Sequence, residues 1–219
     1  MRFAVCVFPG SNCDYDTYYV IRDILNQEVS FVPYTQRSLE GFDCVVLPGG
    51  FSFGDYLRAG VLASKTPLGH AIVDFAQKGG LVLGICNGFQ ILTELKLLPG
   101  ALLKNESMRF VCKDVQLRVE NNTIPFTRRF EKGEIIRLPI AHGEGRYYVD
   151  QETLALMQER GQIVLRYYGE NPNGSVDNIA GVCNKEGNVF GLMPHPERAC
   201  EDLLGNHDGL LLWNSLLSL

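Results

Sequence analysis

The sequence lacks several features that would assign it to common classes of protein. Its longest apolar stretches are interrupted by Gly, Pro or charged residues well before the ~18 residues that a membrane-spanning helix needs. Neither a phosphate-binding G-x-x-x-x-G-K-[ST] loop nor a dinucleotide-binding G-x-G-x-x-G motif occurs. Histidines and carboxylates form no cluster with the spacing of metal ligands. We therefore expect no membrane span, no metal and no cofactor in this chain.

Cysteine pairs and long basic runs are also missing. The seven cysteines are scattered without a C-x-x-C pair, which excludes a disulfide framework and favours a reducing compartment. The chain carries 20 Lys and Arg against 25 Asp and Glu, for a net charge of -5, and its longest basic run is Arg128-Arg129. Such a composition argues against partners that are nucleic acids or anionic membranes. The amino terminus is typical of a strand rather than of a secretion signal, so we expect a cytoplasmic location.

What is present is an alternation of buried strands and helices over about the first hundred residues. Unbroken apolar runs alternate with stretches of helical periodicity, which is typical of a parallel sheet covered on both faces. The expected strands are 3–8, 29–32, 44–47 and 81–85, and the expected helices are 14–25, 68–78 and 89–95. These elements predict an α/β fold with a doubly wound, mostly parallel, flavodoxin-like sheet.

The pattern changes after Pro99-Gly100. Hairpin-like segments follow at 115–119, 135–140, 163–168 and 182–193, and residues 210–217 have the pattern of a closing helix. No linker, low-complexity tract or internal repeat separates the two parts. We therefore expect residues 1–219 to form a single domain with an antiparallel extension.

The most specific local motif is Gly84-Ile85-Cys86-Asn87-Gly88, at the junction of a strand and a helix. It has the form G-x-C-x-G, the thiol counterpart of the G-x-S-x-G nucleophile elbow, in which flanking glycines permit a strained turn. The N–H groups at the start of the following helix favour a thiolate. The motif therefore predicts that Cys86 is a nucleophile, with a buried structural cysteine as the alternative.

His195 is the favoured base for this nucleophile. It stands in Pro194-His195-Pro196-Glu197, just after an expected strand, and in an extended segment residues two apart share a side. Glu197 would then orient the His195 ring and complete a triad with Cys86. His142 lies in a glycine-rich loop and is a rival base, less favoured because this loop is not evidently an extended strand in which a carboxylate two residues away would share its side.

Backbone N–H groups are available to bind an oxyanion beside the nucleophile. The tandem glycines of Pro48-Gly49-Gly50 follow the third expected strand and let main-chain N–H groups approach a ligand closely. One of them could act together with the N–H of Asn87. A simple turn is the alternative, because Pro-Gly-Gly also makes turns readily.

The order and spacing of these motifs resemble those of class I, triad-type glutamine amidotransferase domains. Further segments are similar to the glutaminase subunits of phosphoribosylformylglycinamidine synthases, which act in purine biosynthesis. The segments that carry this likeness are FPGSNCD (8–14), PGGFSFGDYLRAG (48–60), NES-x-RF-x-C (105–112), AHGEGRY (141–147), NPNGS (171–175) and GLMPHPER (191–198). Phe53 stands where this subfamily often has Tyr, a departure that affects no catalytic position.

The resemblance implies a role for each matched residue. Cys86 would attack the side-chain amide of glutamine and form a γ-glutamyl thioester, with His195 as the proton shuttle and Glu197 holding its ring. Gly50 and Asn87 would supply the oxyanion hole. Three further residues would help to bind the amino-acid end of glutamine: Gln90, Arg109 and Phe110.

The resemblance also implies partners. Ammonia would pass to a separate, large synthase subunit that binds ATP and Mg²⁺ and converts formylglycinamide ribonucleotide to formylglycinamidine ribonucleotide. A small third subunit would join the complex in many bacteria.

Three other interpretations stay open at this point. The chain could be the glutaminase of a different synthase, for example one that makes GMP, CTP or anthranilate. It could be a DJ-1/PfpI-like cysteine hydrolase, which would share the elbow but has no reason to place His-Pro-Glu near the carboxyl end. It could also be a non-enzymatic subunit with an inactive triad.

Overall fold

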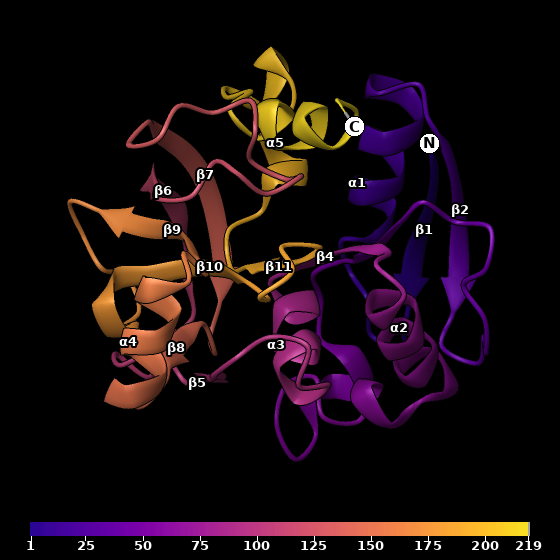
Figure 1. Ribbon diagram of the computed structural model, residues 1–219, viewed down its shortest axis with the longest axis horizontal. Coiled ribbons are helices and arrows are strands. Elements are labelled where there is room, and N and C mark those ends of the chain that lie inside the picture. The colour runs from indigo at the N-terminus through magenta and orange to yellow at the C-terminus, as the bar shows by residue number, and fades with distance from the viewer. Residues whose placement is uncertain (219) are drawn as a thin grey trace.

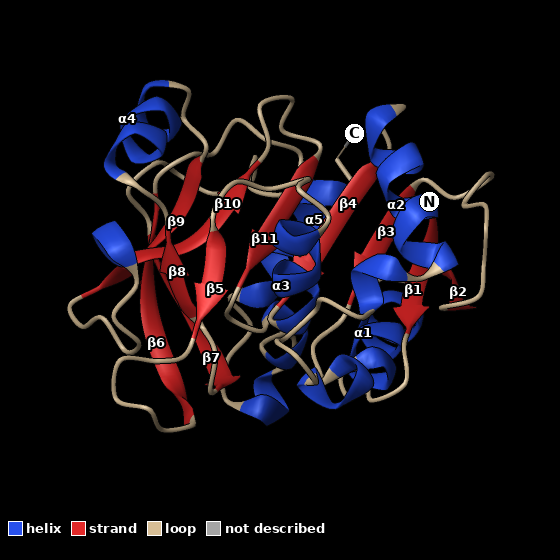
Figure 2. Ribbon diagram, turned by 90° about the horizontal axis from the view of Figure 1, so that it is seen from below, coloured by secondary structure: helices blue, strands red, loops and turns tan. Residues whose placement is uncertain are grey.

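The computed structural model describes residues 1–218, and a nine-stranded sheet runs through its centre in the order β2-β1-β3-β4-β11-β10-β9-β6-β7 (Figure 2). The first five of these strands pair in parallel. They are β2 (Glu28–Pro33), β1 (Arg2–Val7), β3 (Cys44–Leu47), β4 (Leu81–Ile85) and β11 (Val189–Leu192). This is the strand order of flavodoxin-like folds, so the predicted α/β class is confirmed.

Helices cover both faces of the parallel half, as expected for strands that are apolar on both sides. Figure 1 shows α1 (Asp14–Tyr19) and α5 (Gly209–Leu216) on one face of the sheet. The opposite face carries α2 (Pro67–Gln77) and α3 (Asn87–Glu94). The predicted helix 14–25 is α-helical only to Tyr19 and continues as a π-helix over Val20–Ile24.

The antiparallel extension makes up the other four strands of the same sheet. They are β10 (Ile179–Cys183), β9 (Ile163–Tyr168), β6 (Val111–Val119) and β7 (Ile135–His142), and each pairs antiparallel with its neighbours. The expected hairpin 182–193 corresponds to β10 and β11, so it joins the antiparallel half to the parallel half.

A small second sheet and one helix were not predicted from the sequence. β5 (Ala101–Leu103) and β8 (Arg146–Tyr148) form a two-stranded sheet, and α4 (Gln151–Glu159) follows β8. Tyr147 of β8 is buried and stacks on Phe89 of α3, with ring centroids 5.7 Å apart. This contact fixes the loop between β7 and β8 against the start of α3. In the part of the chain that the structure describes, no helix is long and apolar enough to cross a bilayer.

Candidate active site

The ends of four neighbouring strands bring predicted site residues together with Cys13, which was not predicted. Cys13 comes shortly after β1, Gly49 and Gly50 follow β3, Cys86 follows β4, and His195 comes shortly after β11. Because these strands are parallel, their carboxyl ends lie at one edge of the sheet, where ligands bind in open α/β folds.

Cys86 occupies a strained turn between β4 and α3. Its backbone has φ 51° and ψ -104°, a conformation with positive φ that costs about 1–3 kcal/mol for a residue other than glycine. The two glycines of the motif let the helix approach the sheet. A Cβ at Gly88 would stand 2.0 Å from the carbonyl oxygen of Leu47, and one at Gly84 would stand 2.5 Å from the side chain of Leu92. The turn therefore has the nucleophile-elbow geometry that the G-x-C-x-G motif predicts.

His195 and Glu197 form a buried pair. Nδ1 of His195 donates to Oε1 of Glu197 over 2.6 Å, and both side chains are almost completely buried. The predicted contact is present, but its geometry differs from the prediction. Glu197 lies in a 3₁₀ turn over Pro196–Arg198 rather than in an extended segment, and the turn folds its carboxylate back onto the ring. The main-chain N–H of His195 donates to the carbonyl oxygen of Pro139 in β7 over 2.8 Å, which anchors the turn.

The charges around His195 favour an imidazolium. Burial by itself lowers the pKa of His195, but the charges of Glu197 and of Cys86 outweigh it, and the pKa lies well above its ordinary value. Among the described residues, Nε2 of His195 has no hydrogen-bond partner. A buried ring nitrogen without a partner is the group that a nucleophile and a leaving group need for proton transfer.

The glycines after β3 pack directly against this pair. A Cβ at Gly49 would stand 2.7 Å from Cε1 of His195 and 3.5 Å from Cβ of Cys86. Gly50 has φ 149°, and a Cβ there would meet the backbone nitrogen of Asn12 at 2.7 Å. Asn87 is the first residue of α3, where N–H groups have no acceptor within the helix. The role of the Gly50 and Asn87 N–H groups as an oxyanion hole stays a prediction.

Gln90 and Asn87 link the elbow to the loop after β7. Nδ2 of Asn87 donates to Oε1 of Gln90 over 2.9 Å, and Nε2 of Gln90 donates to the carbonyl oxygen of Glu144 over 2.7 Å. Both Oε1 and Nε2 of Gln90 are therefore hydrogen-bonded within the protein, and these bonds hold the elbow to the loop after β7. The contact of Gln90 with glutamine stays a prediction.

Arg109 and Phe110 lie in an exposed loop that Asn105 holds in place. Nδ2 of Asn105 donates to the carbonyl oxygens of Arg109 and His142, both over 2.9 Å. The ring of Phe110 stands over Gly143, 3.7 Å from the point where a Cβ would be. The loop is therefore tied to the His142 region, while the side chains of Arg109 and Phe110 face solvent. Sequence reasoning missed the anchoring role of Asn105, although its motif was visible.

His142 has a structural position rather than the environment of a base. Its Nδ1 donates to Oδ1 of Asn105 over 3.0 Å, and Asn173 faces its Nε2 at 3.5 Å. Burial, followed by the charge of His195, lowers the pKa of His142 to about 4. The ring is therefore neutral at pH 7 and accepts at Nε2, which removes it as a rival to His195.

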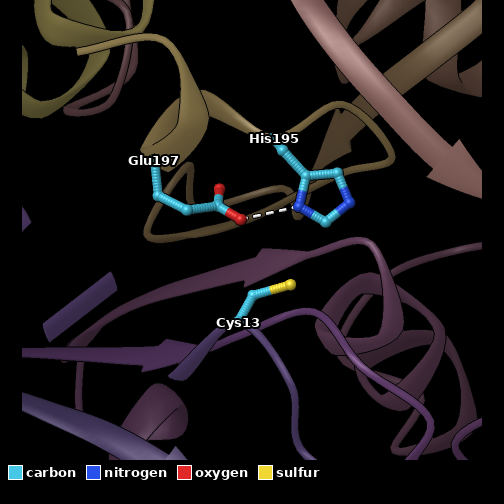
Figure 3. A group of neighbouring side chains, drawn as sticks. All are labelled: Cys13, His195 and Glu197. Carbon is cyan, nitrogen blue, oxygen red and sulfur yellow. Dashed lines mark hydrogen bonds and ion pairs between the residues drawn. The ribbon is translucent and has the colours of Figure 1, made fainter. Parts of the chain in front are cut away.

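Cys13 is a neighbour of the triad that the sequence did not reveal. Sγ of Cys13, a ring nitrogen of His195 and a carboxylate oxygen of Glu197 lie within 4.8 Å of one another (Figure 3). This donor set would suit a zinc ion by chemistry alone. However, Nη2 of Arg198 donates to Sγ of Cys13 over 3.1 Å, and this fixed positive charge opposes a cation at the same place. The cluster is better explained as part of the surroundings of the acid–base pair.

Comparison with known proteins agrees with this geometry. The sequence matches the CobB/CobQ-like glutamine amidotransferase domain over residues 1–209. The chain therefore belongs to this family of glutamine amidotransferases.

Its relatives define a narrower group within the family. Phosphoribosylformylglycinamidine synthase subunit PurQ of Aquifex aeolicus is 69% identical over 226 residues and is covered completely, as is this chain. The PurQ protein of Alkaliphilus metalliredigens is 56% identical over 217 residues, which cover 99% of this chain and 96% of the relative.

Solved structures give the same grouping. A chain in the structure of PurLQS from Thermotoga maritima is 50% identical, with a TM-score of 0.91 and coverage of 99% of this chain and 97% of that chain. A glutamine amidotransferase from the same organism is only 19% identical, with a TM-score of 0.63 and coverage of 98% and 90%, and so shares the fold alone.

Proposed function

We propose that this chain is the glutamine-hydrolysing subunit of a phosphoribosylformylglycinamidine synthase. The observation that carries the proposal is the buried His195–Glu197 pair beside the strained elbow of Cys86. The full-length identity of 69% to a PurQ protein supports the particular synthase. The chain supplies ammonia for the conversion of formylglycinamide ribonucleotide to formylglycinamidine ribonucleotide.

We assign a group to each catalytic step. Nε2 of His195 has already taken the proton of Cys86, and the Sγ thiolate attacks the amide carbon of the glutamine side chain. The N–H groups of Gly50 and Asn87 stabilise the negative oxygen of the tetrahedral intermediate. His195 then protonates the departing nitrogen, so ammonia leaves and a γ-glutamyl thioester remains on Cys86.

Hydrolysis of the thioester uses the same groups in reverse. His195 takes a proton from water, the hydroxide attacks the thioester carbon, and glutamate leaves as Cys86 is regenerated. Glu197 keeps the imidazolium oriented and stable throughout, because its carboxylate is 2.6 Å from Nδ1. No cofactor of this chain takes part in these steps.

Partners complete the reaction. Ammonia passes to a large synthase subunit that binds ATP and Mg²⁺, and a small third subunit joins the assembly. The similar chain from Thermotoga maritima belongs to a structure of PurLQS. This supports such a complex for this chain. Seven free cysteines suit a reducing compartment, which supports a cytoplasmic location.

The alternatives have less support. A DJ-1/PfpI-like hydrolase gives no reason for the buried contact between His195 and Glu197. The glutaminase domain of a CTP synthase from Trypanosoma brucei is 14% identical, far below the values for PurQ proteins.

Ammonia release from glutamine, measured with and without the synthase subunit, tests the proposal. The wild-type chain should release ammonia when the large subunit is present, and formation of formylglycinamidine ribonucleotide should depend on both. Cys86→Ser should abolish glutamine-dependent synthesis and leave synthesis from added ammonium salts intact. Cys112→Ser is the matched control, because Cys112 is an exposed residue of β6. Retention of glutamine-dependent synthesis in Cys86→Ser would refute the assignment.

A further inference from the structure

Two thiols border the same imidazole in this site. Cys86 follows β4, and Cys13 precedes α1 on the loop after β1. Both are buried, with 5% and 3% of their surfaces exposed. Figure 3 shows the Cys13 side chain beside the His195–Glu197 pair, within the 4.8 Å cluster. The proposed catalytic mechanism uses Cys86 and leaves Cys13 without a role.

Gly49 lies close to both cysteines and to the imidazole of His195. The point where its Cβ would stand lies 3.1 Å from Sγ of Cys13 and 3.5 Å from Cβ of Cys86. Both cysteines therefore lie next to the same glycine. The main chain fixes Cys13 there, because its N–H donates to the carbonyl oxygen of Gly49 over 3.1 Å.

The surroundings of Cys13 differ from those of the other buried cysteines. Nη2 of Arg198 donates to its sulfur over 3.1 Å, so the sulfur lies in an electropositive environment typical of reactive thiols. Burial instead raises the pKa of the Cys183 and Cys200 thiols to about 12, which keeps them protonated.

We propose that Cys13 is a resolving thiol, which forms a reversible disulfide with Cys86 after a peroxide has oxidised the nucleophile. The inference rests on the proposed function, since it takes Cys86 to be the reactive thiolate of the glutaminase. The disulfide blocks glutamine hydrolysis and protects Cys86 from irreversible oxidation to the sulfinic acid.

The two steps balance with hydrogen peroxide as the oxidant. The Cys86 thiolate attacks one peroxide oxygen, an S–O bond forms, the O–O bond breaks, and the released hydroxide takes a proton to become water. Cys86 has then lost two electrons and is a sulfenic acid. Sγ of Cys13 attacks the Cys86 sulfur, the S–S bond forms, the S–O bond breaks, and a second water leaves with the Cys13 proton.

Peptide mapping after peroxide treatment tests this inference in the full chain. Wild-type protein should yield a peptide pair joined between Cys13 and Cys86, lighter by two hydrogens, and its glutaminase activity should be lost and then restored by dithiothreitol. In Cys13→Ser the activity before oxidation is the reference for that variant, because Cys13 lies beside the acid–base pair. After the same treatment it should be lost without recovery, and Cys86 should carry a sulfinic acid. Cys112→Ser is the matched control and should behave like wild type.

Two results would overturn the inference. One is recovery of activity in Cys13→Ser equal to that of wild type, and the other is a Cys86 adduct with no link to Cys13. If Cys13→Ser is poorly folded, Cys13→Ala gives the same readout. Labelling of Cys86 by a glutamine-like electrophile, run in parallel on unoxidised protein, separates this failure from that of the proposed function. Labelling without a disulfide rejects only the resolving thiol, whereas absence of labelling rejects the glutaminase assignment.

Discussion

At the scale of single residues, the site depends on the electrostatic interaction between two buried side chains, Glu197 and His195. The carboxylate of Glu197 and the imidazole of His195 are 2.6 Å apart and almost fully withdrawn from solvent. Burial disfavours charge on either group, so each charge is stable only because the other is present. Removing one partner therefore changes the chemistry of the second.

Glu197→Gln should lower glutaminase activity about 10²- to 10⁴-fold without unfolding the chain. The amide keeps the shape of the side chain but not its charge, so the pKa of His195 should fall toward or below its ordinary value. Steady-state kinetics over a range of pH and NMR titration of the His195 ring measure both effects. Glu159→Gln, on the exposed end of α4, is the control. An unchanged pKa of His195 would show that Glu197 is not its main charge partner.

His142 should make the fold sensitive to acid. Its folded-state pKa of about 4 is below the ordinary value of 6.5. The unfolded chain therefore binds a proton at His142 first as the pH falls. The contribution of the neutral ring is present above about pH 6.5 and is lost on going down to about pH 4, up to about 3 kcal/mol.

Urea unfolding of wild type and His142→Asn at pH 7.5 and pH 4.5 measures this effect. The wild type should lose more stability between these two pH values than the variant does. His70→Asn, on the exposed face of α2, should retain the wild-type pH dependence. Equal losses in wild type and His142→Asn would assign the acid sensitivity to other groups.

At the scale of elements, close contact between α3 and the sheet holds the elbow. Gly88→Ala should destabilise the fold by about 1–3 kcal/mol, because the added Cβ would stand 2.0 Å from the carbonyl oxygen of Leu47. Gly143→Ala is the matched control, since its nearest neighbour would be Phe110 at 3.7 Å, an ordinary contact. Thermal unfolding of the two variants gives the comparison. Equal stability of Gly88→Ala and wild type would mean that α3 can shift away from β3 at no cost.

The helices and strands differ in how well the sequence predicts their bounds. The bounds of β3, β4 and β9 match the expected ranges, because each is a short, mainly apolar or aromatic run. β5 and β8 have only three residues each, too few for a periodic signal. The helix α4 was not predicted, although Asp150 caps it through Thr153, a signal present in the sequence.

The sequence predicted part of the site: the residues that local motifs mark, but not the contacts that the fold creates. Local motifs singled out Cys86, His195 and Glu197, and the fold brings them to one edge of the sheet. The 3₁₀ turn that joins His195 to Glu197 was not foreseen, since His-Pro-Glu gives no periodic pattern. The approach of Cys13 to His195 was also invisible, because the pairing of β1 and β3 and the order of the sheet create it.

At the scale of the whole molecule, the glutaminase should be weak when the chain is alone. Free ammonia would be wasted without a synthase subunit to receive it. Addition of the large subunit should raise kcat/KM for glutamine by about 5- to 150-fold, the usual range of coupling between sites. Ammonia release measured against the concentration of the large subunit checks this, and a heat-denatured sample of it is the control. Full activity of the isolated chain would contradict such coupling.

The central claim is that Cys86 is the nucleophile of a glutamine-hydrolysing site, and covalent labelling tests it most directly. The chain is treated with a glutamine-like electrophile, alone and with its synthase partner, and the modified residue is located by peptide mass spectrometry. We predict a single adduct on Cys86 that free glutamine suppresses, with Cys13 and Cys112 unmodified. Labelling spread over several cysteines and indifferent to glutamine, even in the presence of the synthase partner, would contradict the account.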